Sequence, residues 1–243
     1  MQVATIHLRI SFYITEPKAQ SGLFNRRSFF KTPLVMRSNT VLVDKSLEVL
    51  CRLFSQTIPE KLTAQLETSA QKHKHLIPDK CYKTDDVREP HVTVRFGCYI
   101  ERGGSGSIRV SENNEILKEF LEENKTLWIF VSMLLCLFDL ELAEIIQKIP
   151  LFYRIFGLFS IGFWNVTNIS KLHRDLKDLC WCAAIPFGEF EGGMLDLKFL
   201  NTTVHVKRGD ICFFKSKDLF HNLSEVFENR QVMILTNHAA VVS

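Results

Sequence analysis

The sequence predicts an α+β fold in which N-terminal helices support a C-terminal jelly-roll core. Two observations lead to this prediction. Upstream of residue 156, apolar residues recur mostly at helical spacing, and from Phe156 onward short apolar runs alternate with turn residues. Several short strands at such spacing indicate a sandwich or barrel, and helices packed on one face of a jelly roll fit the order. The length of 243 residues suits one large domain, or one domain with an extension.

Residues 1–40 show no sustained period, and we interpret them as a basic N-terminal arm. Six basic groups stand against the single acid Glu16 in the first 37 residues: Arg9, Lys18, Arg26, Arg27, Lys31 and Arg37. Such an arm can neutralise phosphates, or it can be a solvated tail. The net charge of the whole chain is only +3, which excludes neither alternative.

Residues 41–155 are expected to form a helical support region. In 44–76, apolar residues first fall at helical spacing (Leu47, Leu50, Cys51 and Phe54), and the pattern resumes after Pro59. Residues 112–148 predict two more helices, of which the second contains the apolar run Leu127–Phe138. One early strand is expected at 91–100, because that segment is rich in β-branched and aromatic residues.

Residues 156–243 are expected to form the jelly roll itself. The predicted strands are Leu158–Trp164, Leu179–Phe187, Met194–Leu200, Thr203–Val206, Ile211–Phe214 and Gln231–Asn237. Turn residues separate them at Gly188, at the pair Gly192–Gly193, and at Arg208–Asp210.

Cysteine usage and hydropathy indicate an intracellular protein, nuclear or cytoplasmic, without a membrane segment. The seven cysteines are odd in number, irregular in spacing and contain no CxxC pair, which favours free thiols over a zinc knuckle. His7 and Arg9 interrupt the first ten residues, so we expect no secretory signal. The run Leu127–Phe138 is too short to cross a bilayer.

His173, Asp175 and His221 are the candidate metal ligands. Two histidines and one carboxylate form the facial triad of non-haem Fe(II) oxygenases, which leaves the opposite face of the metal open. Residues i and i+2 of an extended segment point to the same side, so His173 and Asp175 can reach one metal ion. His221 must then come from a strand that is distant in sequence but adjacent in the barrel.

Three further features add to this pattern. Arg230 opens the last predicted strand, where its guanidinium can project into the barrel and bind a carboxylate through two hydrogen bonds. The glycines in 188–193 permit tight turns and close backbone approach. The turn Arg208–Asp210 leads into the strand that precedes His221.

These residues resemble the fungal TET/JBP-like branch of the 2-oxoglutarate oxygenases. The resemblance covers about a third of the chain strongly, and a weaker similarity reaches back to about Val87. It is carried by Phe159–Asn165, His173-Arg174-Asp175 with Asp178, Ile185–Gly188, Phe190–Gly193, Gly209-Asp210, Phe214, Ser216, Leu219, His221 and Arg230.

The resemblance implies a double-stranded β-helix core that requires Fe(II), 2-oxoglutarate and O2. It implies His173, Asp175 and His221 as iron ligands and Arg230 as the residue that binds the C5 carboxylate of 2-oxoglutarate. More weakly, it implies that Asp178 and His238 contact the substrate base, although the animal branch has Asn where this chain has Asp178. The expected reaction oxidises the methyl group of a modified pyrimidine, 5-methylcytosine or thymine, in nucleic acid, with DNA favoured over RNA.

Two other functions fit the same residues. A protein side-chain hydroxylase of the prolyl type uses the same triad and arginine, because the substrate lies outside the metal shell. A catalytically silent jelly-roll binding protein is the third possibility, since fold does not fix function. The pocket mouth discriminates between the first two: groups that read a base edge favour nucleic acid, and a groove favours a peptide.

Overall fold

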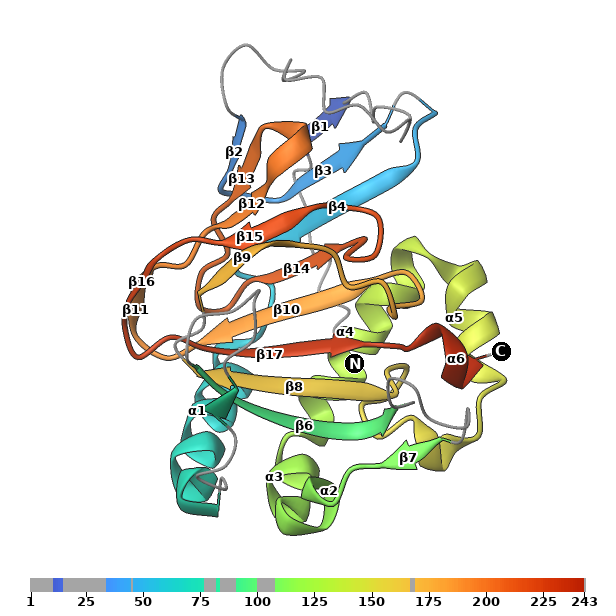
Figure 1. Cartoon of the computed structure of the whole chain (residues 1–243), viewed down its shortest axis with the longest axis vertical. Helices are drawn as coiled ribbons and strands as arrows, with labels where there is room; N and C mark the ends of the chain where they lie inside the picture. Colours follow the sequence, from blue (N-terminus) through green and yellow to red (C-terminus); the bar gives the residue numbers. More distant parts are fainter. Residues whose placement is uncertain are drawn as a thin grey trace, which may run out of the picture.

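The computed structural model describes residues 11–14, 34–44, 46–76, 82–83, 91–99, 108–166 and 169–242. Its centre is a large, mostly antiparallel sheet, against which a smaller sheet packs (Figure 1). In spatial order the large sheet contains β1 (Ser11–Ile14), β3 (Thr40–Val43), β4 (Val49–Phe54), β14 (Ile211–Phe214), β10 (Cys182–Phe187), β17 (Gln231–Thr236), β8 (Ile161–Val166), β6 (His91–Tyr99) and β5 (Tyr82–Lys83), with β7 (Arg109–Val110) paired to β6.

The smaller sheet has the order β2 (Leu34–Met36), β13 (Thr202–Val204), β12 (Leu195–Leu197), β15 (His221–Leu223) and β9 (Ser170–His173). A separate two-stranded ribbon pairs β11 (Phe190–Gly192) with β16 (Val226–Glu228). From β8 onward the chain crosses repeatedly between the two facing sheets, as in a jelly roll, so the expected α+β jelly-roll fold is confirmed.

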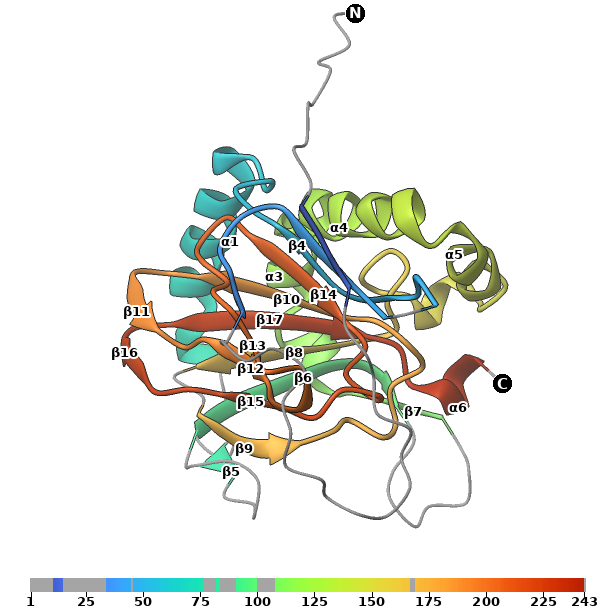
Figure 2. The same cartoon turned by 90° about the horizontal axis from the view of Figure 1, so that it is seen from above.

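Helices cover the face of the large sheet that points away from the smaller one (Figure 2). They are α1 (Glu60–His73), α2 (Asn113–Ile116), α3 (Lys118–Glu123), α4 (Lys125–Phe138) and α5 (Leu140–Gln147), with α6 (Ala239–Val242) at the C-terminal end of the described residues. Short 3-10 turns lie at Lys74–Leu76, Leu151–Tyr153 and Lys198–Leu200.

The segment predicted as two helices over 112–148 forms four. Asn124 separates α3 from α4, and its side-chain amide donates to the Phe120 carbonyl at 2.8 Å. Asp139 separates α4 from α5 because its carboxylate accepts the Leu142 N–H at 3.0 Å, which caps the second helix. The other Asp139 oxygen accepts the Trp181 indole N–H at 2.7 Å, which fixes this corner to the sheet.

The helical interpretation of 44–58 is wrong. This segment contains β4, a strand between β3 and β14 in the large sheet. Its apolar residues are buried on both faces of the sheet, and such a run has the same local pattern as a buried helix. Leu47, which began the helical pattern, instead lies in an exposed turn with φ of +64°. Helix α1 begins only after Pro59.

The strands that were predicted from the sequence fall close to their expected positions. β6, β14 and β17 lie within residues 91–100, 211–214 and 231–237, and the remaining predictions shift by a few residues. Strands from 34–54 and 91–99 pair with strands downstream of residue 156. Of the basic groups in the proposed arm only Arg37 is described, and it is exposed; the others lie outside the described residues. The six described cysteines are free.

Two cores flank the large sheet. On the helix side the core is aromatic, with Phe120 stacked on Trp164 at a centroid distance of 4.9 Å. Between the sheets the core is aliphatic and includes Leu42, Leu53 and Val204. Helix α4 packs its inner face into the aromatic core, and none of the described helices is long and apolar enough to cross a bilayer.

Candidate metal centre

The two candidate histidine ligands are direct neighbours across a pair of strands. β9 and β15 are antiparallel, and their register pairs His173 with His221. Residues opposite one another in such a pair point to the same face of the sheet, so the two imidazole rings lie side by side, with centroids 4.3 Å apart. The strand register therefore brings together two residues that are far apart in sequence.

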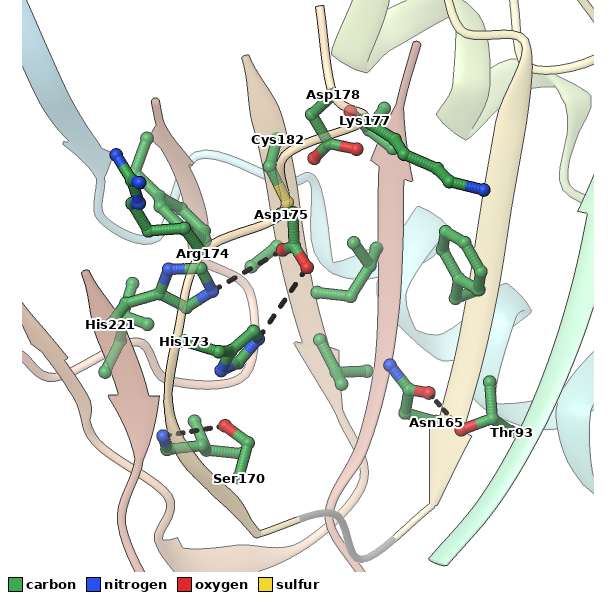
Figure 3. A pocket seen from close by; sticks show the side chains of 18 of the residues that line it. Thr93, Asn165, Ser170, His173, Arg174, Asp175, Lys177, Asp178, Cys182 and His221 are labelled. Atoms are coloured by element: carbon green, nitrogen blue, oxygen red, sulfur yellow. Dashed lines mark hydrogen bonds and ion pairs between the residues drawn. The ribbon is translucent and has the colours of Figure 1, made fainter. Parts of the chain in front are cut away.

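Asp175 completes the group from the loop after β9 (Figure 3). Its backbone N–H donates to the Ser216 carbonyl at 3.1 Å, which fixes the loop. Its carboxylate oxygens lie 3.7 Å from His173 Nε2 and 3.5 Å from His221 Nε2. The three ligand atoms lie within 4.8 Å of one another. Donors of one metal ion lie about 3 Å apart, so this spacing suits a single cation after small adjustments.

Hydrogen bonds orient both rings. The Nδ1–H of His173 donates to the Lys171 carbonyl at 2.8 Å, and the Nδ1–H of His221 donates to the Leu219 carbonyl at 2.9 Å. Because a carbonyl can only accept, each Nδ1 carries a proton, which leaves Nε2 as the ring atom that can bind a metal. This arrangement is typical of histidines that ligate a metal through Nε2.

A cavity of about 360 Å³ opens beside the three residues, between the two sheets. One side of the cavity is formed by strands β8, β10 and β17 of the large sheet. The opposite side is formed by strands β9, β12 and β15 of the smaller sheet. Much of the lining is apolar, including Leu195, Val232 and Ile234, which lowers the local dielectric and strengthens interactions among the polar groups. This size lies in the range of small-molecule sites.

Arg230 lines the same cavity and is only 3% exposed. Its Nε has no hydrogen-bond partner among the residues that the structure describes, and Phe190 stacks near the guanidinium at 5.4 Å. Burial lowers the pKa of Arg230 to about 10. A buried cation in this situation is stabilised by an anion, and a carboxylate matches the planar guanidinium.

Glycine makes room for Arg230. Gly193 has φ of +62°, and a Cβ there would lie 2.7 Å from Arg230 Cδ. The expectation that glycine in 188–193 permits close backbone approach is therefore met at this position. The predicted turn at Arg208–Asp210 also forms, and Arg208 pairs with Glu60 and Glu67 on α1.

Asp178 and His238 also line the cavity, and an isolated antiparallel bridge joins their backbones. Burial and the neighbouring Asp175 charge raise the pKa of Asp178 to about 7. The Ser216 hydroxyl donates to Asp178 Oδ2 at 2.5 Å. Burial, with the charges of Lys177 and Arg95, lowers the pKa of His238 to about 4, and its Nδ1 is buried without a described partner.

Sequence reasoning did not identify two polar pairs in this site. Ser216 supports Asp175 through its carbonyl and Asp178 through its hydroxyl. Thr93 donates its hydroxyl to Asn165 Oδ1 at 2.7 Å, across strands β6 and β8 at the far side of the cavity. The Thr93–Asn165 pair could have been predicted only from the alternation of side chains along β6 and β8, and only by knowing which face of each strand points into the cavity.

A second cluster of potential ligands lies elsewhere, where α1 meets α3. It contains His73, Glu119 and Glu123. Lys72 pairs with both carboxylates, and the Ser69 hydroxyl donates to Glu123 at 2.5 Å. Lys72, Ser69 and His73 lower the pKa of Glu123 to about 2. An ion-pair network that joins the helices accounts for this cluster.

Comparisons with known proteins bear on the fold. No family model matches the chain, and no curated protein matches it. Among solved structures, NgTET1 in complex with 5mC DNA aligns with a TM-score of 0.71 at 18% identity, over 98% of this chain and 84% of that one. An oxidoreductase of the 2OG-Fe(II) oxygenase family from Burkholderia pseudomallei aligns with a TM-score of 0.51 at 13% identity, over 85% and 95%. At these identities the likeness is one of fold.

Proposed function

We propose that this protein is an Fe(II)- and 2-oxoglutarate-dependent dioxygenase related to the TET/JBP-like enzymes. One observation carries the proposal: a His–Asp–His set with converging ligand atoms shares a cavity with a buried arginine whose Nε has no partner among the described residues. The first group suits Fe(II), and the second suits the carboxylate of a co-substrate that chelates the same ion. The solved structures of similar fold support the same reaction class.

Each residue then has a defined task. His173, Asp175 and His221 hold the ion on one face, and Arg230 binds the distal carboxylate of 2-oxoglutarate. When bound, Fe(II) with 2-oxoglutarate and O2 supplies the oxidising power that inserts oxygen into a C–H bond, while 2-oxoglutarate becomes succinate and CO2. The apolar side chains of Leu195 on one sheet and of Val232 and Ile234 on the other exclude water from the co-substrate.

For the substrate, we propose a methylated pyrimidine of nucleic acid, more readily DNA than RNA. The base must leave the stack to reach the cavity, and its edge must meet polar groups there. Asp178 can accept from the exocyclic amine of cytosine. His238 stays neutral near pH 7 because its pKa is about 4, so its ring offers one donor and one acceptor. A nuclear or cytoplasmic location fits this substrate.

A protein side-chain hydroxylase is the alternative enzyme, and a silent binding protein is the alternative without activity. The cavity favours a nucleic-acid substrate over a protein side chain, because the buried Nδ1 of His238, which has no described partner, lies beside the buried carboxylate of Asp178. Such a pair suits the flat polar edge of a base. Arg230 favours an active enzyme over the silent binding protein, because a vestigial site has no need of a buried cation whose Nε lacks a partner among the described residues.

The reaction class is tested by succinate formation from 2-oxoglutarate, with Fe(II) added anaerobically before O2. The wild type is expected to form succinate only when Fe(II) is present, and His221→Ala should form none. His205→Ala is the matched control, because this histidine lies away from the three ligands. Equal turnover by His221→Ala and the wild type would remove the metal assignment.

The substrate is tested by mass spectrometry of nucleosides after turnover on methylated DNA and RNA, beside a peptide library. Asp178→Ala and His238→Ala should slow base oxidation by roughly fivefold to a hundredfold, because each loses a buried hydrogen bond. Both should leave 2-oxoglutarate decay in the absence of substrate unchanged. If the wild type oxidises peptides and never a nucleic acid, the protein-hydroxylase alternative replaces this proposal.

A further inference from the structure

A tight turn lies at the opening of the metal cavity. It spans residues 175–178, and the Asp178 N–H closes it by donating to the Asp175 carbonyl at 2.9 Å. Leu176 and Lys177 form its tip. Both line the cavity and both are exposed, Leu176 to 65%, which places the tip where the cavity meets solvent. We call residues 174–178 the rim turn.

Hydrogen bonds to other elements hold the rim turn in place. The Asp175 N–H donates to the Ser216 carbonyl at 3.1 Å, and the Lys177 carbonyl accepts the Ala239 N–H at 2.9 Å. The backbone is thus fixed on both sides of Leu176, so this side chain projects from a preorganised support. A side chain on such a support loses little conformational entropy when it enters a contact.

Leucine is an unusual residue for the tip of a tight turn, where Gly, Pro, Asn, Asp and Ser dominate. A single exposed leucine is ordinary on a protein surface and indicates nothing alone. The surroundings of Leu176 are what distinguish it. In Figure 3, Arg174 and Lys177 extend to opposite sides of Asp175. The Arg174 guanidinium stacks over the Phe220 ring at 4.6 Å, and Lys177 is exposed. An apolar tip therefore lies between two cations.

The two ends of the cavity differ in charge. β17 runs from the ribbon of β11 and β16 toward α6, and the rim turn lies at the α6 end, where Asp178 bridges His238 (Figure 1). Residues 174–177 contain two cations and one acid, the candidate ligand Asp175. Residues 188–193 and 224–229 at the ribbon end contain four exposed glutamates and no cation. A polyanion is therefore attracted to the rim turn and repelled from the ribbon.

We propose that Leu176 enters a nucleic-acid duplex in place of the base that swings into the cavity. This inference rests on the proposed function, because only a base that leaves its stack creates such a gap. Leucine is among the apolar side chains that act as wedges between base steps. With Leu176 in the gap, Arg174 and Lys177 meet the phosphates on its two sides, which fixes the register of the strand. The gap then adjoins the cavity opening, so the base passes directly from one to the other.

A wedge of this kind acts on a duplex and adds little on a single strand. In a duplex the vacated position closes again, and the base returns to its partner, unless another group fills the gap. In a single strand the base is already free to leave its neighbours, so extruding it costs least there. The role of Leu176 is therefore measured by the ratio of kcat/KM on a methylated duplex to kcat/KM on the same methylated strand alone.

Leu176→Ala should lower this duplex-to-single-strand ratio about tenfold, because one stacked base step contributes about a factor of ten. Leu176→Met keeps the length of the side chain and should keep most of the ratio. Leu172→Ala is the matched control. Leu172 is 42% exposed and lies next to His173 on β9, so it points to the opposite face of the strand, away from the cavity. Circular dichroism should be the same for the wild type and all three variants, since both positions are solvent-exposed.

A second measurement reports base extrusion without turnover. 2-Aminopurine placed beside the methylated cytosine fluoresces when its neighbour leaves the stack, and the protein is loaded anaerobically with Fe(II) and 2-oxoglutarate. The wild type should raise the fluorescence of the duplex. Leu176→Ala should bind the duplex with a much smaller rise. Arg174→Gln and Lys177→Gln should each weaken duplex binding and reduce the slope of log affinity against log salt by about one.

The outcomes separate this inference from the proposed function. If the wild type oxidises methylated duplexes while Leu176→Ala keeps both the ratio and the fluorescence rise, the wedge is wrong and the proposed function stands. An equal loss in Leu172→Ala would overturn the wedge as well. Duplexes that are opened in a Leu176-dependent way but never oxidised would support the wedge and refute base oxidation. A wild type that binds no nucleic acid, and acts only on peptides, would overturn both.

Discussion

Replacing Arg230 with methionine should make the free protein more stable and at the same time weaken 2-oxoglutarate binding. The side chain is 3% exposed, and its Nε has no described partner. Methionine fills a similar volume without a charge. A pKa lowered from 12.5 to about 10 corresponds to roughly 3 kcal/mol of lost solvation for the cation. Removing the charge should therefore raise the free energy of unfolding by about 1–3 kcal/mol, or roughly 2–10 °C in melting temperature.

The effect on binding has the opposite sign. A carboxylate that pairs with a buried arginine loses about 2–5 kcal/mol when the arginine is truncated. The dissociation constant of 2-oxoglutarate should rise roughly thirtyfold to several thousandfold in Arg230→Met. Arg230→Lys should lie between the two, because an ammonium keeps the charge but cannot form the bidentate pair.

Two assays measure these effects: anaerobic calorimetric titration of 2-oxoglutarate into the Fe(II) protein, and thermal unfolding without the co-substrate. The control is Arg208→Met, because Arg208 is already paired with Glu60 and Glu67. It should lower the melting temperature and leave 2-oxoglutarate affinity close to that of the wild type. An Arg230→Met protein that binds 2-oxoglutarate as tightly as the wild type would refute the assigned role.

Three other substitutions test separate features. Gly193→Ala should raise the dissociation constant of 2-oxoglutarate at least about tenfold, measured by the same titration, because its Cβ meets Arg230 and its backbone has positive φ. Asp139→Ala should lower the free energy of unfolding in urea by about 2–3 kcal/mol, because it removes the cap of α5 and the partner of the Trp181 indole; Asp139→Asn should lose less. The pKa of Glu123 is lowered to about 2. The ionised carboxylate therefore stabilises the folded state fully above about pH 4.5, and this contribution is lost as the pH falls toward 2. After allowance for solvent screening this amounts to about 1 kcal/mol, and Glu123→Gln should flatten that part of a stability–pH curve.

The fold class was predictable because the strands of the C-terminal half have clear ends. β14 is bounded by a glycine turn and a polar turn, and β17 begins directly after Arg230. β4 was missed because it is buried on both faces, which erases the alternation that identifies a strand. Four helices replaced two because the chain breaks at Leu117, whose φ of −115° and ψ of 32° are not helical, and at Asp139, whose carboxylate caps α5. Hydrophobic spacing reveals neither break.

For the candidate site, the sequence supplied residue types but not their surroundings. The His173–Asp175 spacing indicated a common side of the chain, and the pairing with His221 depends on a strand register that no local pattern encodes. Nothing in the sequence indicates that the Arg230 Nε lacks a described partner, or that Ser216 supports both Asp175 and Asp178. These are properties of packing between elements distant in sequence.

The position of β9 has a consequence for local opening of the structure. In the order of the described strands, β9 ends the smaller sheet, and it pairs only with β15 in a register that shifts between His221 and Leu223. An edge strand with so few partners opens more easily than the core. The proposed cation, held by both His173 and His221, would join these two strands and stabilise their pairing. Amide hydrogen exchange in residues 170–173 should then slow when the metal binds, while exchange in the central strands β10 and β17 stays unchanged.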